Sequence, residues 1–86
     1  MRIKEQPGII PLSNAELRDY IFIYAYCPDE HFEHKLLEMG FVPGSSLKVL
    51  EKTNMGHKSS VLVKIKGSTL ALNMQIAENI LISPQQ

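Results

Sequence analysis

The feature that most constrains the fold is a pair of short apolar segments joined by three residues that include a glycine. Val61–Ile65 has the alternation typical of a half-buried strand, and Thr69–Leu72 follows shortly after Gly67. Because glycine readily adopts the positive φ that a tight turn requires, the two segments predict a β-hairpin. Lys64 and Lys66 would then lie on its solvent-exposed face.

Three further segments have the composition of strands, namely Tyr20–Tyr26, Leu47–Glu51 and Ile80–Ile82. The first is rich in aromatic and β-branched residues. Its tyrosines stand at alternate positions, which predicts that they share one face of the strand, opposite Ile21 and Ile23.

A helix is predicted between the first two of these strands. Pro28 and Asp29 suit its first turn, and Gly40 suits its C-terminal end. Its apolar residues recur at helical spacing. We expect the leucines of this helix and of the hairpin to build the core, namely Leu36, Leu37, Leu70 and Leu72.

Capping residues predict two shorter helical turns. Ser13 and Glu16 have the spacing of a capping box. Asn73 is a favourable N-cap for Met74–Glu78.

A chain of 86 residues forms at most one domain. The order of its elements predicts a mainly β fold with short helices: a small barrel of about five strands, with a helix between the first and second strands. Residues 1–11 are interpreted as an N-terminal arm, residues 12–82 as the barrel domain and residues 83–86 as a polar tail.

Charge and composition restrict the classes of function. Nine basic and nine acidic side chains leave no net charge, so the basic surplus of a nucleic-acid-binding protein is missing. No signal peptide is evident, and the apolar runs are shorter than the ~20 residues that span a bilayer. A single cysteine, Cys27, suits a reducing compartment. We therefore expect a soluble cytoplasmic protein that neither binds nucleic acid nor inserts into a membrane.

Two segments carry a resemblance to a known family. Residues 36–44 read Leu-Leu-Glu-Met-Gly-Phe-Val-Pro-Gly, and residues 67–72 read Gly-Ser-Thr-Leu-Ala-Leu. In this order and spacing they resemble the ferrous-iron-transport A family, FeoA, over residues 12–82. The resemblance implies an SH3-like barrel. It also implies a small cytoplasmic bacterial protein that assists or regulates the ferrous-iron permease FeoB, whose cytoplasmic domain binds GTP.

The start of the predicted helix contains the candidate metal ligands, which are Cys27, Glu30, His31 and His34. Thiolate, imidazole and carboxylate groups bind transition metals. However, no second half-site completes a ligand shell, and a short amphipathic helix needs a polar face in any case. A solvated helix face is therefore the favoured interpretation, and no metal or cofactor site is assigned. Cys27 and His31 could form a thiolate–imidazole pair, but nothing supplies an oxyanion hole, so we do not expect an enzyme.

The predicted partner-binding site is the centre of the segment Thr53–Ser59, interpreted as an exposed loop, and consists of Asn54, Met55, Gly56 and His57. Methionine at a loop tip adapts to partner surfaces. The two family segments are interpreted as mostly structural, so the working surface is expected outside them.

The main hypothesis is an accessory protein that binds the cytoplasmic part of a FeoB-type permease. One alternative is a metal-responsive regulator or sensor module that binds Fe(II) or another transition metal through Glu30–His34. Another is a generic SH3-like peptide-binding module whose tyrosines line a groove. Self-association is left open.

Overall fold

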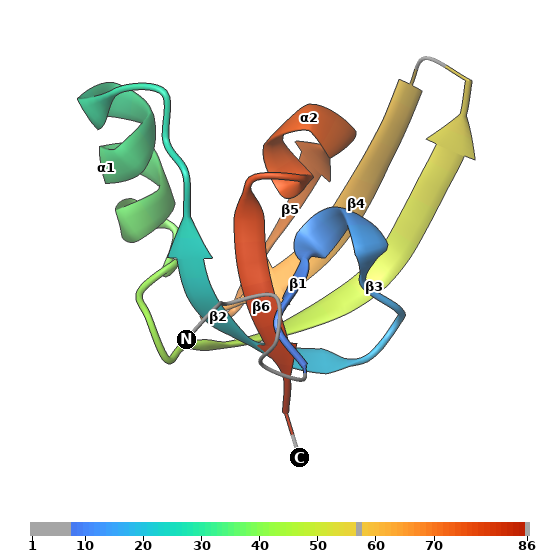
Figure 1. Cartoon of the computed structure of the whole chain (residues 1–86), viewed down its shortest axis with the longest axis horizontal. Helices are drawn as coiled ribbons and strands as arrows, with labels where there is room; N and C mark the ends of the chain where they lie inside the picture. Colours follow the sequence, from blue (N-terminus) through green and yellow to red (C-terminus); the bar gives the residue numbers. More distant parts are fainter. Residues whose placement is uncertain (1–7, 57, 86) are drawn as a thin grey trace.

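The computed structural model describes residues 8–56 and 58–85 (Figure 1). Six strands, two α-helices and one 3-10 helix lie within them. In chain order, these are β1 (Ile10–Pro11), the 3-10 helix (Leu12–Asn14), β2 (Asp19–Ala25), α1 (Glu30–Glu38), β3 (Ser46–Met55), β4 (Lys58–Ile65), β5 (Ser68–Asn73), α2 (Met74–Ala77) and β6 (Ile80–Pro84).

The strands form one antiparallel sheet in the order β1-β6-β2-β3-β4-β5. The last strand, β6, therefore lies between β1 and β2, so the first and last strands of the chain are neighbours in the sheet (Figure 1). This arrangement confirms the predicted mainly β fold with a helix, α1, between its first two long strands. The short strand β1 was not predicted. It forms because Ile10 and Pro11 pair with Ile82 and Leu81 of β6.

The inner face of the sheet surrounds a single apolar core. Alternate residues of β4, namely Val61, Val63 and Ile65, are almost completely buried, as the alternation predicted. Each such side chain contributes roughly 1.5–3 kcal/mol through burial. Within residues 8–56 and 58–85, no polar or charged residue belongs to the buried class. The core is thus held together by apolar packing.

Helix α2 covers one end of the barrel, where it contacts β4, β5 and the 3-10 helix. The Asn73 side chain caps it by accepting a hydrogen bond from the Ile76 N–H at 2.8 Å, as predicted. Ala77, the last residue of this helix, is fully buried. No helix in the part of the chain that the structure describes is long and apolar enough to cross a membrane.

The capping box predicted for Ser13 and Glu16 is wrong. The 3-10 helix begins after Pro11, and no side chain caps it. Instead, the Glu16 N–H donates to the Tyr20 hydroxyl at 2.8 Å. Leu12, the first residue of the 3-10 helix, is fully buried. Its tertiary packing overrides the local capping preference of Ser13.

The hairpin of β3 and β4 is longer than predicted and projects from the barrel (Figure 1). Most of Thr53–Ser59 was expected to be loop, but Thr53 pairs with Ser60, Asn54 with Ser59 and Met55 with Lys58. The prediction of a loop across this segment is wrong, because main-chain pairing with the facing strand does not require apolar side chains.

Candidate partner-binding site

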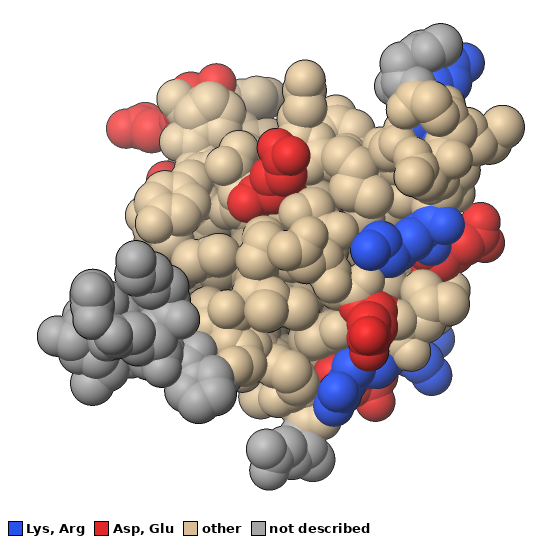
Figure 2. Space-filling view, turned by 45° about the vertical axis from the view of Figure 1, so that its right-hand side comes forward, with Lys and Arg blue, Asp and Glu red and all other residues tan. Residues whose placement is uncertain are grey.

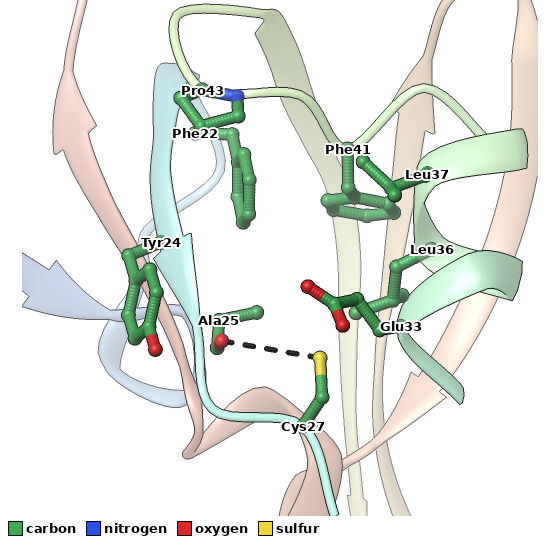
Figure 3. A pocket seen from close by; sticks show the side chains of 9 residues that line it. All are labelled: Phe22, Tyr24, Ala25, Cys27, Glu33, Leu36, Leu37, Phe41 and Pro43. Carbon is green, nitrogen blue, oxygen red and sulfur yellow. Dashed lines mark hydrogen bonds between the residues drawn. The ribbon is translucent and has the colours of Figure 1, made fainter. Parts of the chain in front are cut away.

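An apolar pocket opens between β2, α1 and the segment that joins α1 to β3 (Figure 3). Its volume of about 160 Å³ is close to the ~150 Å³ of an apolar cavity that holds one benzene ring, and below the ~300 Å³ at which most small-molecule sites begin. The pocket therefore fits one apolar side chain better than a cofactor. It is lined by Phe22, Tyr24, Ala25, Cys27, Glu33, Leu36, Leu37, Phe41 and Pro43.

The inner wall of the pocket is aromatic. Phe22 of β2 and Phe41 are buried and meet edge to face, with ring centroids 5.4 Å apart and an interplanar angle of 80°. A Schellman motif at the end of α1 places Phe41: its N–H donates to the Leu36 carbonyl at 2.9 Å, and the Gly40 N–H donates to the Leu37 carbonyl at 3.0 Å. Gly40 has a φ of +103°, so it ends the helix as predicted.

A β-bulge in β2 forms one side of the pocket. Phe22 pairs with Ile82 whereas Tyr24 pairs with Leu81, so the bulge places Ile23 as an extra residue. An extra residue moves the following side chains to the other face of the sheet. Tyr20 is therefore buried whereas Tyr24 is 53% exposed, and the prediction that the tyrosines share one face is wrong.

The rim of the pocket is also apolar. Tyr24 and Tyr26 are both exposed and pack edge to face with their centroids 5.1 Å apart. Leu37, which also lines the pocket, is 46% exposed. Placing Leu37 in the core was wrong, because the short helix α1 buries only one face and Leu36 occupies it. Tyr24, Tyr26, Leu37 and the pocket form an exposed apolar surface of the kind that binds protein partners. We call it the pocket face.

Two polar groups point into the pocket (Figure 3). The Cys27 thiol donates weakly to the Ala25 carbonyl, with an S···O distance of 3.9 Å. Burial raises the pKa of this thiol, and the nearby carboxylates of Glu33 and then Asp29 raise it further. The thiol is therefore held in its neutral form at neutral pH, which leaves the Glu33 carboxylate as the charged group of the pocket.

The candidate metal ligands are not brought together. Glu30, His31 and His34 lie on the exposed face of α1, while Cys27 faces the pocket. Among residues 8–56 and 58–85, no three His, Cys, Asp or Glu side chains are placed to hold a metal ion.

The predicted site at the hairpin tip lies apart from the pocket. Asn54, Met55 and Gly56 are exposed, and Met55, at 71%, is the most exposed large apolar residue among those that the structure describes. His57 lies outside the described residues. None of the three described residues lines the pocket. Sequence reasoning missed the pocket because it assigned residues 36–44 a mostly structural role. The signal available was a pair of adjacent leucines on a short helix that buries only one of its faces.

Comparison with solved structures agrees with this architecture. A crystal structure of an iron uptake regulatory protein, FeoA, is 25% identical with a TM-score of 0.68, and the match covers 87% of this chain and 94% of that one. A Stenotrophomonas maltophilia FeoA complexed with zinc, described as a prokaryotic SH3 domain protein, is 21% identical with a TM-score of 0.66, covering 86% of this chain and 89% of that one. A manganese-dependent transcriptional repressor shares the fold at 17% identity and a TM-score of 0.77, and the match covers 93% of this chain but only 44% of the repressor. A comparison with curated proteins found no match.

The fold and the pocket face define a small SH3-like barrel with an exposed apolar surface. The family model of the FeoA domain matches residues 10–84. The chain belongs to the FeoA family, which is associated with ferrous iron transport. The resemblance inferred from residues 36–44 and 67–72 is thereby confirmed.

Proposed function

We propose that this protein is a cytoplasmic accessory protein of ferrous iron uptake that binds the cytoplasmic part of a FeoB-type permease, and that it acts by binding rather than by catalysis. The observation that supports this proposal is the pocket face. An apolar pocket of about 160 Å³ with an apolar rim is suited to one anchoring side chain of a protein partner.

The size of the pocket suggests a reversible contact. Burying one leucine or phenylalanine side chain contributes roughly 1.5–3 kcal/mol to the binding free energy. Contacts between the partner and the pocket rim must therefore supply the rest of the affinity. Binding changes the activity of a permease only if the protein prefers one of the permease's conformations. The hairpin tip, residues 54–57, remains a proposed second contact.

The proposal is tested by calorimetry with the isolated GTP-binding domain of a FeoB-type permease, in its nucleotide-free, GDP-bound and GTP-analogue-bound forms. Leu37→Asp places a charge at the pocket rim and should abolish binding. Leu17→Asp is the matched control, because Leu17 is 63% exposed and does not line the pocket. Absence of binding in all three nucleotide states, or equal loss with both variants, would contradict the proposal.

A further inference from the structure

We propose that the pocket also accepts the hairpin tip of a second copy of this chain. Met55 of one molecule enters the pocket of the next, and Lys58 of the same tip pairs with the Glu33 carboxylate. This inference goes beyond permease binding and does not depend on it, because both surfaces belong to the same chain.

Strand pairing brings Met55 and Lys58 together at the end of the β3–β4 hairpin. Met55 and Lys58 are cross-strand partners, so their side chains lie on the same face of the hairpin. Gly56 turns the chain with a φ of +61°. The Ser59 hydroxyl lies 2.9 Å from the Asn54 side-chain oxygen and 3.3 Å from the Gly56 carbonyl, and can donate to either. This strand pairing and these hydrogen bonds limit the conformational entropy that Met55 and Lys58 lose when they bind.

The pocket matches this tip in size and chemistry. An unbranched, flexible methionine side chain adapts to an apolar cavity of about 160 Å³. Glu33 then faces the neighbouring ammonium group of Lys58, which makes the contact complementary in charge as well as in polarity. In Figure 2, the visible lysine and arginine side chains lie on the hairpin side of the molecule, whereas acidic side chains lie both there and on the side of α1.

The arrangement of the two surfaces decides the kind of assembly. In Figure 1, α1 and the free end of the β3–β4 hairpin lie on opposite sides of the molecule. Met55 is the last residue of β3 and does not line the pocket of its own chain. Because the two surfaces lie on opposite sides of the molecule, one contact leaves a free hairpin end and a free pocket, so association can continue head-to-tail into rings or open chains. The contact is small, so we expect weak association that grows with protein concentration.

Sedimentation velocity over a range of protein concentrations, with Cys27 as a reporter, tests this inference. Cys27 is the only cysteine and lines the pocket, so its alkylation by iodoacetamide at alkaline pH should slow as association increases. Met55→Asp should abolish both the association and the protection. Leu50→Asp, which changes an exposed leucine in the body of the same hairpin, should preserve both.

Complementation tests the head-to-tail geometry. Protein alkylated at Cys27 retains the tip but has a blocked pocket, whereas Met55→Asp retains the pocket but lacks the anchor. Each should be monomeric alone, and their mixture should form a heterodimer and nothing larger.

A charge reversal tests the ion pair. Glu33→Lys should weaken association by roughly tenfold, and Glu33→Lys combined with Lys58→Glu should restore it. The proposal is overturned if the wild type is monomeric at every concentration, if association survives both Met55→Asp and alkylation, or if the double reversal restores nothing.

Discussion

Gly40→Ala should destabilise the fold by about 2–5 kcal/mol, in two separable parts. The first part is backbone strain, because Gly40 has a φ of +103°, and a left-handed conformation costs an L-residue about 1–2 kcal/mol. The second part is steric. A Cβ at this position would lie 2.3 Å from Lys66 Cγ and 3.0 Å from Lys66 Cβ. Rotation of the lysine can move Cγ away but not Cβ, so overpacking adds about 1–3 kcal/mol.

Lys66→Gly separates the two parts. Lys66 itself has a φ of +52°, so glycine relieves strain there while adding entropy to the unfolded chain, and its net effect should stay within about 1 kcal/mol. In the Lys66→Gly background, Gly40→Ala should retain only its backbone strain. The coupling energy of this double-mutant cycle should therefore be about 1–3 kcal/mol, measured by urea unfolding followed by circular dichroism.

Gly44→Ala is the matched control. Gly44 has a φ of +93°, but no atom lies within 4 Å of a Cβ built there. This substitution should cost only backbone strain, with no coupling to Lys66→Gly. The reasoning is refuted if Gly40→Ala costs the same in both backgrounds, since the contact with Lys66 would then make no difference.

Three further predictions concern the helix cap, the core and the pocket thiol. Asn73→Ala removes the cap hydrogen bond to the Ile76 N–H and should cost about 1 kcal/mol in urea unfolding; an unchanged midpoint would contradict the capping role. Val63→Ala removes fully buried methyl groups and should lower the unfolding free energy by about 1–3 kcal/mol, against less than about 0.5 kcal/mol for an exposed-surface substitution. Glu33→Gln removes a carboxylate that raises the pKa of Cys27, so the pH profile of thiol alkylation should move to lower pH and the rate at neutral pH should rise; an unmoved profile would contradict the influence of Glu33 on the thiol.

Local patterns determined much of the fold. Asn73 caps α2, Gly40 ends α1 and Gly67 turns the chain between β4 and β5, each as the sequence predicted. These features depend on φ preferences and on hydrogen bonds between residues a few positions apart. Such short-range physics can be seen in a sequence without knowledge of the rest of the chain.

The candidate site depended on tertiary structure. A single extra residue at Ile23 turns Tyr24 outward, and no local pattern marks that bulge. Leu36 and Leu37 are adjacent residues of the same type. Only the position of the sheet relative to α1 buries Leu36 and leaves Leu37 at the pocket rim. By itself the sequence determined most of the helices and strands, and the family to which the chain belongs. The tertiary structure decided which apolar side chains stay uncovered, because that depends on how the elements pack and not on what each residue prefers.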